Sequence, residues 1–383
     1  MDKGRRKFFK LFAAGGIGAG LTPLIAAGLE KTSIDEPTAT NIADALKYPR
    51  KKNSLPGKYP GRVVKVHNES SISGDVINDE AVSKMLGNGM LQLTGDSDIN
   101  KAWRNFVSPG EVIGLKVNPI GGKLLSTSHA IVKSVIAQLE DSGISRKDIV
   151  IFDRRMQQLL DAGFTRENYP GIKIVATEHV DESGSYYNEK GELYSLSMID
   201  KDWYYWADCE MEYDDYLLPF MVNQGKYSYF SKIITRQLDK VINLPIMKNA
   251  GASVTLCLKN LGYGVITNTS RLHSTLWAET SAHVCAFPPV RDKVVLNIAD
   301  GIRGCFDGGP GANPQFFTDY KMLLIGTDPV AVDMTGYDII IGKRIEMGRQ
   351  NALADSGLNQ MLIAQELGLG IADKEKIDLI EIT

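Results

Sequence analysis

Residues 112–153 read VIGLKVNPIGGKLLSTSHAIVKSVIAQLEDSGISRKDIVIFD, and their pattern predicts a strand, a helix and a second strand in succession. The apolar runs 112–117 and 148–153 have the length of buried strands. Between them, residues 129–139 carry apolar side chains at helical spacing, after the capping residues Ser126-Thr-Ser128 and before Gly143. A helix that joins two such strands is typical of parallel pairing. The stretch therefore predicts an α/β fold, with a mostly parallel sheet flanked by helices.

The same alternation extends in both directions along the chain and defines the expected domain. It begins near Gly61, resumes at Lys240 and runs to a final apolar strand at 377–382. We expect one α/β domain over residues 61–383, interrupted by an inserted excursion at 180–230 that is rich in Tyr, Trp and acidic residues. Its aromatic side chains are suited either to an irregular small core or to stacking on a sugar or a cation. Residues 30–60 contain prolines, a basic run and little hydrophobic periodicity, which predicts a linker.

The N-terminus has the layout of an export signal. Arg5 and Arg6 are followed by Phe8, Phe9 and a long uncharged run up to Leu29 that is diluted by glycines. An arginine pair before a mildly apolar segment is typical of a twin-arginine signal over residues 1–29. The run is also long enough to stay uncut as an anchor. We expect a periplasmic protein, or one held at the outer face of the inner membrane, whose only membrane contact is its N-terminus and whose first partner is the twin-arginine export machinery.

Composition limits the classes of partner and cofactor. The 383 residues are 43% hydrophobic and 23% charged, with a net charge of −3, which argues against a nucleic-acid partner. Four cysteines lie far apart and form no Cys-x-x-Cys pair, so they give no local signature of a zinc or iron–sulfur site. Each cysteine is expected to be either buried or disulfide-bonded.

Polar side chains near the ends of apolar runs are the candidates for chemistry. The carboxyl ends of parallel strands build the site in such folds, and a buried charge needs a partner or a ligand there. Lysine and arginine side chains favour an anionic ligand, such as a carboxylate or a phosphate. The expected ligand- or cofactor-binding residues are Lys116, Asn118, Lys248, Lys259, Asn260 and Arg303, and the expected catalytic residues are His273, Asp300 and Asp333.

Each of these residues has a role in that hypothesis. His273 is the natural proton carrier because its pKa lies near neutrality. Asp300 and Asp333 are suited to orienting it or to binding a metal, although the sequence supplies no definite metal-ligand set. Asp328 precedes Pro329 and is expected to cap a helix instead. The glycine-rich segment 304–311 lacks a nucleotide-binding spacing and is either an anion cradle or a plain surface loop.

Three segments together resemble a family catalogued as domain of unknown function 362. They are Leu115-Lys-Val-Asn-Pro119, the region from Ile242 to His273 with its Asn-Leu-Pro, Lys-Asn-Leu-Gly and Arg-Leu-His motifs, and the region from Ile298 to Asp333 with Asp-Gly-Ile and Thr-Asp-Pro-Val-Ala-Val-Asp. The resemblance covers roughly residues 61–340. This chain has Asn249 and Ala250 where the family often has a histidine, and it lacks the cysteine-rich ferredoxin-like domain of some relatives.

The resemblance, together with a remote similarity of the Lys-Asn helix and the Asp-Gly loop to nickel-pincer lactate racemases, implies cofactor-dependent chemistry. We therefore expect an exported cofactor- or metal-dependent enzyme, an oxidoreductase or an isomerase, that carries out redox or hydride-transfer chemistry on a small anionic substrate. Its cofactor, a metal or a nucleotide-type group, would be inserted before export. The alternatives are a non-catalytic protein that binds an anionic ligand, and an accessory subunit or assembly factor of an exported redox complex with a redox partner protein.

Overall fold

The computed structural model describes residues 37–223, 225–251, 253–349 and 356–383. The predicted export signal at residues 1–29 lies outside these ranges. Within them, no helix is long and apolar enough to cross a membrane.

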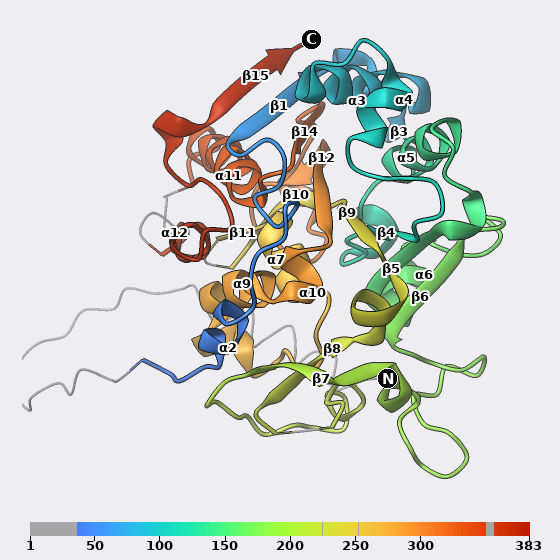
Figure 1. The fold of residues 1–383 in the computed structure, drawn as a ribbon, viewed down its shortest axis with the longest axis vertical. Coiled ribbons are helices and arrows are strands. Elements are labelled where there is room, and N and C mark those ends of the chain that lie inside the picture. The colour runs from blue at the N-terminus through green and yellow to red at the C-terminus, as the bar shows by residue number, and fades with distance from the viewer. Residues whose placement is uncertain (1–36, 224, 252, 350–355) are drawn as a thin grey trace, which may run out of the picture.

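A large mixed sheet forms the centre of the molecule (Figure 1). Its strands follow the order β15-β1-β14-β12-β9-β4-β5-β6; off this path, β10 and β13 pair with β12, and β11 pairs with β10. The strand bounds are Arg62–His67 (β1), Ile113–Lys116 (β4), Ile149–Arg155 (β5), Lys173–Glu178 (β6), Lys240–Asn243 (β9), Ile246–Ala250 (β10), Ser253–Thr255 (β11), Val294–Cys305 (β12), Phe317–Thr318 (β13), Met322–Gly326 (β14) and Asp378–Ile382 (β15).

Parallel pairing dominates this sheet, so the predicted α/β class is confirmed. The strands β12, β9, β4, β5 and β6 run parallel to their neighbours. Three strands run antiparallel to their neighbours: β14 between β12 and β1, β13 beside β12, and β11 beside β10. Because the parallel strands end at one edge, the polar residues that follow β4 and β5 are brought side by side.

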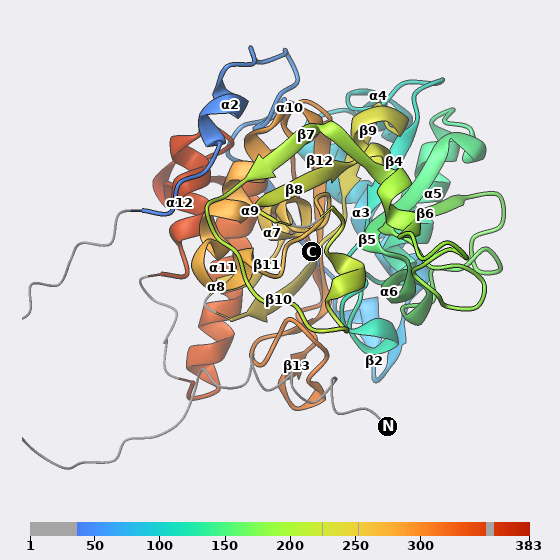
Figure 2. The same ribbon diagram turned by 90° about the horizontal axis from the view of Figure 1, so that it is seen from below.

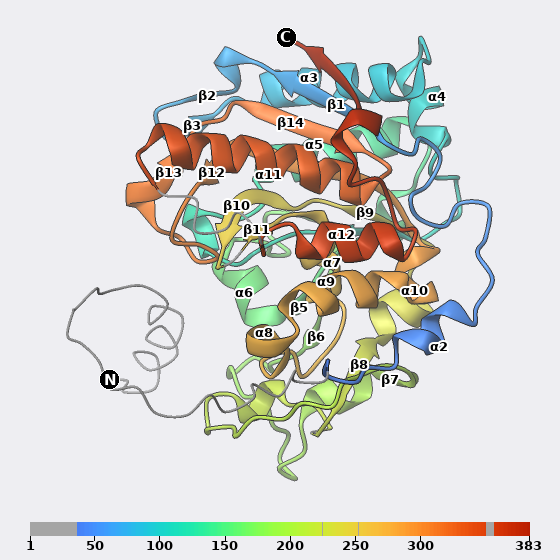
Figure 3. The ribbon, with the colours of Figure 1, turned by 90° about the vertical axis from the view of Figure 1, so that its left-hand side faces the viewer.

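Helices cover both faces of the sheet. The segments α3, α4 and α5 pack on one face, and α7, α9, α11 and α12 on the other, which Figure 3 shows in front. The helix bounds are Ile42–Leu46 (α2), Asp79–Thr94 (α3), Ile99–Arg104 (α4), His129–Asp141 (α5), Met156–Asp161 (α6), Cys257–Gly262 (α7), Leu272–Thr275 (α8), Trp277–Ala286 (α9), Pro288–Arg291 (α10), Pro329–Glu346 (α11) and Asn359–Glu366 (α12).

Local capping explains where two of these helices begin. Ser128 precedes α5, and its hydroxyl accepts a hydrogen bond from the Ile131 amide, 3.4 Å away. The Asp328 carboxylate caps α11 by accepting from the amides of Val330 (2.9 Å) and Ala331 (3.0 Å), as the sequence predicts. Asp328 also accepts from the Gly61 amide and so ties the start of the domain to this helix.

The described part of the expected linker, residues 37–60, packs against the domain rather than standing off as a spacer. Thr40 forms a β-bridge with Ala207, and the Leu55 amide donates to the Arg291 carbonyl over 2.8 Å. The Arg291 guanidinium in turn donates to the carbonyls of Tyr48 and Pro49. Most of these contacts use backbone amides and carbonyls, which leave no hydrophobic periodicity in the sequence, while Ala45 and Leu55 are the segment's buried core residues.

The aromatic-rich excursion at 180–230 forms a small sheet of its own. The antiparallel strands Ile199–Trp206 (β7) and Tyr227–Ser231 (β8) cross one end of the molecule, in the foreground of Figure 2. Tyr205 and Phe230 are buried against the main core. The buried Arg271 side chain holds the excursion by donating to the carbonyls of Ala207 and Lys226 at 3.1 and 2.8 Å. A second short antiparallel pair, Ile72–Ser73 (β2) and Val76–Ile77 (β3), precedes α3.

All four cysteines are free thiols, and three of them, Cys257, Cys285 and Cys305, are buried. The expected burial is thus found for these three without a disulfide, whereas Cys209 is partly exposed and free, so neither expectation holds for it.

Candidate functional site

A cavity of about 390 Å³ lies where β4 and β5 end, beside α7. The residues that line it and carry polar side chains are Lys116, Asn118, Asp153, Arg154, Gln158, Thr255, Lys259, Asn260, Tyr263, His273, Ser274 and Trp277. Its volume lies within the range typical of small-molecule sites.

Five of the predicted site residues line this one cavity: Lys116, Asn118, Lys259, Asn260 and His273. Lys248 is not part of the lining, but its ammonium contacts two residues that are. The Lys248 ammonium donates to the Asn118 side-chain oxygen at 2.9 Å and to the Ile120 carbonyl at 2.5 Å. Six residues separated by up to 157 positions in the sequence, 116 to 273, thus meet at one edge of the sheet.

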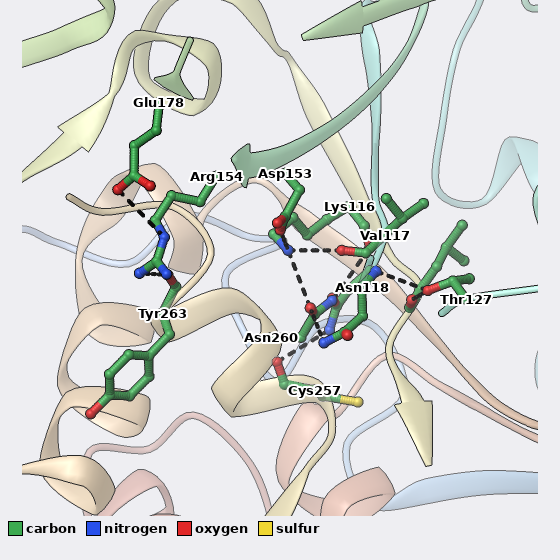
Figure 4. Close-up of polar contacts among 12 residues, drawn as sticks. Lys116, Val117, Asn118, Thr127, Asp153, Arg154, Glu178, Cys257, Asn260 and Tyr263 are labelled. Carbon is green, nitrogen blue, oxygen red and sulfur yellow. Dashed lines mark hydrogen bonds and ion pairs between the residues drawn. The ribbon is translucent and has the colours of Figure 1, made fainter. Parts of the chain in front are cut away.

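Lys116 and Asp153 form a buried ion pair in the cavity wall (Figure 4). Lys116 ends β4, and Asp153 stands on the neighbouring parallel strand β5. The Lys116 ammonium also donates to the Val117 carbonyl at 2.9 Å and to the Asn260 side-chain oxygen at 3.1 Å. These three acceptors use all three of its protons. Lys116 therefore shapes the charge of the cavity but has no donor left for a ligand.

A row of amide side chains runs from the cavity under α7. Asn118 donates to Asn260 at 3.1 Å, Asn260 to Asn243 at 2.8 Å, and Asn243 to Asn297 at 2.9 Å. Asn297 ends the row by donating to the Thr327 carbonyl at 3.2 Å. All four asparagines are buried, so each satisfies polar atoms of the next one. Figure 4 shows the cavity end of this row, where Asn118 and Asn260 lie beside Lys116.

Lys259 differs from the other two lysines because its ammonium has no hydrogen bond or ion pair with any described residue. It projects from α7 into the cavity, 5.8 Å from the centre of the Tyr263 ring. Burial lowers the pKa of Lys259 to about 8. Thr255 is a second unpartnered group on the same wall: its residue is 3% exposed, and its hydroxyl has no partner within the described ranges. An unpaired buried hydroxyl is costly unless a ligand satisfies it, and the partly exposed Lys259 ammonium has no counter-ion among the described residues.

Arg154 and Thr269 set the orientation of His273. The Arg154 guanidinium contacts the Thr269 hydroxyl and the Tyr263 carbonyl, the latter at 3.2 Å, and pairs with Glu178 at 3.6 Å. The Thr269 carbonyl lies 2.9 Å from His273 Nδ1, so Nδ1 carries the proton and Nε2 carries the lone pair. Burial, followed by the positive charges of Lys259 and Arg154, lowers the pKa of His273 to about 3, so the imidazole is neutral at pH 7.

Besides Lys248, three predicted site residues stand outside the cavity lining: Arg303, Asp300 and Asp333. Arg303 lies on the surface, where it pairs with Asp319 and Asp75 at 2.6 Å each and donates to the Gly74 carbonyl. Successive side chains of a strand point to opposite faces, and Arg303 and Asp300 lie an odd number of positions apart on β12. The Arg303 side chain therefore points away from Asp300, although the two residues are close in sequence. The structure gives Arg303 a role in joining surface loops.

Asp300 and Asp333 are fixed by backbone amides away from the cavity. Asp300 accepts from Ser128 N at 2.7 Å and Ile302 N at 3.0 Å, and burial raises its pKa to about 6. Asp333 accepts from the amides of Cys257 (2.6 Å) and Leu258 (3.0 Å). These amides open α7, so Asp333 acts as a remote cap for the helix that carries Lys259 and Asn260. Neither carboxylate contacts His273.

Two important wall residues, Asp153 and Arg154, were not assigned to the site from sequence. The signal for Asp153 was present, because it follows an apolar strand in the same way as Asn118 does. Arg154 has no such signal, since a cation next to an aspartate at a strand end is common on protein surfaces. The short loop at Gly264 gave no signal either: a side chain there would clash with the Lys116 ammonium and the Asn260 carbonyl.

The donor set of the cavity suits an anion. Within the described ranges, no three His, Cys, Asp or Glu side chains gather in a way that could hold a metal ion. Amines and amides instead surround the single carboxylate Asp153, which is already paired with Lys116. These residues do not fit a metal ion, whereas they fit a carboxylate or a phosphate group. The glycine-rich segment 304–311 contributes only Pro310 to the cavity lining.

No curated protein is significantly similar in sequence to this chain. Among solved structures, it is similar to a crystal structure of a protein from Thermotoga maritima, determined by the Northeast Structural Genomics Consortium, with a TM-score of 0.37 and 8% sequence identity. That alignment covers 72% of this chain and 60% of the other, so the chain spans less than two thirds of that protein. Residues 209–338, which carry Lys248, Lys259, Asn260 and His273 but neither Lys116 nor Asn118, match the model of the family described as domain of unknown function 362.

Proposed function

We propose that this protein binds a small anionic organic molecule in the cavity and acts on it as an enzyme. The observation that carries the proposal is the pair of unpartnered groups, the Lys259 ammonium and the Thr255 hydroxyl, on one wall. Arg154 adds a further donor, because the contacts described above leave its Nη2 group without a partner among the described residues. An anion placed between these groups would satisfy all three.

His273 supports an enzyme over a passive binding protein. Its neutral imidazole is held in one tautomer by Thr269, with the lone pair on Nε2, which is the arrangement that a general base needs. The proposed reaction is proton transfer at a carbon next to the anionic group. His273 would take or return the proton, while Lys259 and Arg154 hold the charge. The alternatives are a binding protein and an accessory subunit of a redox complex, which would leave His273 without a chemical role.

The setting that we propose is outside the inner membrane. Arg5, Arg6 and the uncharged run to Leu29 support export by the twin-arginine machinery, or retention at the outer face by an uncut N-terminus. That route is suited to a protein that folds, and acquires any cofactor, before export.

Calorimetric titration of the purified protein with lactate, malate and inorganic phosphate tests the binding step. Lys259→Met should weaken binding of the preferred anion at least about tenfold, or about 1.4 kcal/mol. Arg303→Met is the matched control, because it removes a cation that lies outside the cavity lining, and it should leave the affinity unchanged. Equal losses in the two variants would mean that net charge, and not this cavity, attracts the anion.

Hydrogen exchange separates catalysis from binding. Incubation with lactate or malate in D2O, followed by NMR, should show deuterium at the carbon that bears the hydroxyl if the enzyme removes that proton. His273→Ala should abolish the exchange while the affinity stays within about tenfold. The unaltered protein and the His273→Ala variant could instead both bind the ligand, while neither exchanges its hydrogen for deuterium nor inverts its stereochemistry. That result would favour a binding protein.

A further inference from the structure

Three lysines meet around the cavity: Lys116 and Lys248 are buried, Lys259 is partly exposed, and their partners differ. The Lys116 ammonium donates its three protons in hydrogen bonds to Asp153, Val117 and Asn260. Lys248 is tied to Asn118 and Ile120. Only Lys259, of these three, presents an amine to the cavity with no acceptor among the described residues. An amine without an acceptor is free to act as a nucleophile.

The surroundings of Lys259 lower its pKa to about 8 and so give it a larger neutral fraction than an ordinary lysine has. The groups that face it are the Tyr263 ring, the neutral His273 and the ammonium of Lys248, and none of these is an anion. The one carboxylate of the wall, Asp153, is bound by Lys116. A desolvated lysine without a counter-ion is the setting in which catalytic amines form covalent intermediates.

We propose that Lys259 forms a Schiff base with the aldehyde or keto carbonyl of a small anionic ligand. This inference rests on the proposed function and assigns the substrate class: a 2-oxo acid or a related carbonyl compound. The Lys259 nitrogen bonds to the carbonyl carbon, and the two amine hydrogens leave with the carbonyl oxygen as water. No group is oxidised or reduced, and the imine nitrogen then takes up one proton.

Neighbouring groups supply the remaining requirements of that reaction. His273 Nε2 can accept the proton that leaves nitrogen as the carbinolamine forms and return it to the departing hydroxyl. Arg154 and Thr255, which also line the cavity, would bind the ligand carboxylate after Lys259 has lost its charge. Thr255 thereby gains the hydrogen-bond partner that its buried hydroxyl otherwise lacks.

Reductive trapping with glyoxylate and cyanoborohydride at pH 8, followed by peptide mass mapping, tests the proposal on the full-length protein. Glyoxylate should label Lys259 roughly tenfold faster than Lys84, because the neutral amine is the reactive form and burial lowers the pKa of Lys259 to about 8. Lys84 is the stringent reference, since its side chain is 68% exposed. Lactate has no aldehyde or keto group that could form an imine. As a competitor for the cavity, it should slow labelling at Lys259 but not at Lys84.

Two variants keep the test decisive. Lys259→Arg retains the charge and removes the primary amine, so it should lose the cavity adduct and keep the affinity for lactate within about tenfold. Lys84→Arg should change neither. If glyoxylate labels only exposed lysines and the protein still binds lactate, the Schiff-base proposal is wrong and the proposed anion site still holds. Labelling at Lys259 that lactate does not slow would overturn the anionic substrate class. Absence of both labelling at Lys259 and lactate binding would overturn the proposed function as well.

Discussion

Lys116 and Asp153 hold each other in place across two neighbouring parallel strands, with side chains only 1% and 7% exposed. Neither residue can be removed without leaving a charge in the protein interior. The Lys116 ammonium would keep only the neutral acceptors of Val117 and Asn260, which do not balance its charge.

Asp153→Asn is therefore expected to lower the free energy of unfolding by about 3–5 kcal/mol, the usual result of breaking a buried pair. Denaturation in urea measures it. Glu80→Gln is the control, because Glu80 pairs with Lys84 on the exposed face of α3 and its loss should cost at most about 1 kcal/mol. Similar losses in the two variants would mean that the buried pair is no more important than a surface one.

The affinity for anions should depend on pH through Lys259. With a pKa of about 8, its amine carries a full charge below pH 7 and loses it as the pH rises past 8, so binding of lactate should weaken across that range. His273, with a pKa of about 3, stays neutral over this pH range. The plot of affinity against pH should therefore show no inflection near pH 6.5, where an ordinary histidine titrates. The other charged groups around the cavity are Lys116, Asp153, Arg154 and Lys248.

Lys259→Arg separates these contributions in the same titration. Because the arginine stays charged, the decline near pH 8 should disappear. A decline that survives in this variant belongs to Lys248, whose pKa burial lowers to about 7, and would show that this lysine and not Lys259 controls affinity.

Asp333→Ala should destabilise the fold without changing the ligand affinity of the molecules that remain folded. The substitution leaves the amides of Cys257 and Leu258 without their acceptor, at a cost of about 1–3 kcal/mol. Thermal unfolding followed by titration at a temperature where the variant is folded measures both quantities. Asp338→Ala is the control on the same helix, since Asp338 makes only an exposed pair with Lys374. A catalytic role for Asp333 would appear as lost deuterium exchange at full stability.

Gly264→Ala should be destabilising although alanine is the smallest change available. The new methyl group would meet the Asn260 carbonyl and the Lys116 side chain, both fixed by their buried partners, and overpacking of this kind costs about 1–3 kcal/mol. Gly342→Ala provides the opposite control: no described residue lies within 4 Å of its new methyl group on α11, and alanine should stabilise that helix by about 0.5–1 kcal/mol. Equal effects in urea denaturation would contradict the close approach at Gly264.

Replacing Arg5 and Arg6 by lysine should block export while leaving the folded protein inside the cell. The twin-arginine pair is read as a specific signal, so conserving its charge does not conserve its function. Cell fractionation with an antibody against the mature domain measures the outcome. Periplasmic protein at the unaltered level in the double variant would remove the basis for this route.

The sequence predicted those parts of the fold and the site that depend on local patterns. The strand–helix–strand unit at 112–153 follows from apolar spacing, and the convergence of Lys116, Lys259 and His273 follows from polar residues at the ends of apolar runs. Asp333 and Arg303 were misassigned for a common reason. Whether a carboxylate caps a distant helix, or a cation turns toward solvent, depends on contacts between segments that share no local pattern.

The same limit explains residues 37–60 and Arg154. Arg291 binds the carbonyls of Tyr48 and Pro49, across more than 240 positions of sequence, and such a contact needs no characteristic residue at the carbonyl end. Arg154 acts by fixing Thr269, whose carbonyl orients His273, and no spacing rule connects these three positions.

The row of buried asparagines has a direction, and its two ends impose it. Lys248 can only donate and the Thr327 carbonyl can only accept, so every amide between them must present its oxygen toward Lys248 and its nitrogen toward Thr327. Turning one amide over would set oxygen against oxygen on one side and nitrogen against nitrogen on the other. Conversion of any one of these four asparagines to aspartate, the common chemical ageing of this residue, would remove a donor that no rearrangement of its neighbours can replace. The durability of the cavity in a long-lived protein is thus tied to how well α7 and the sheet keep water away from these four amides.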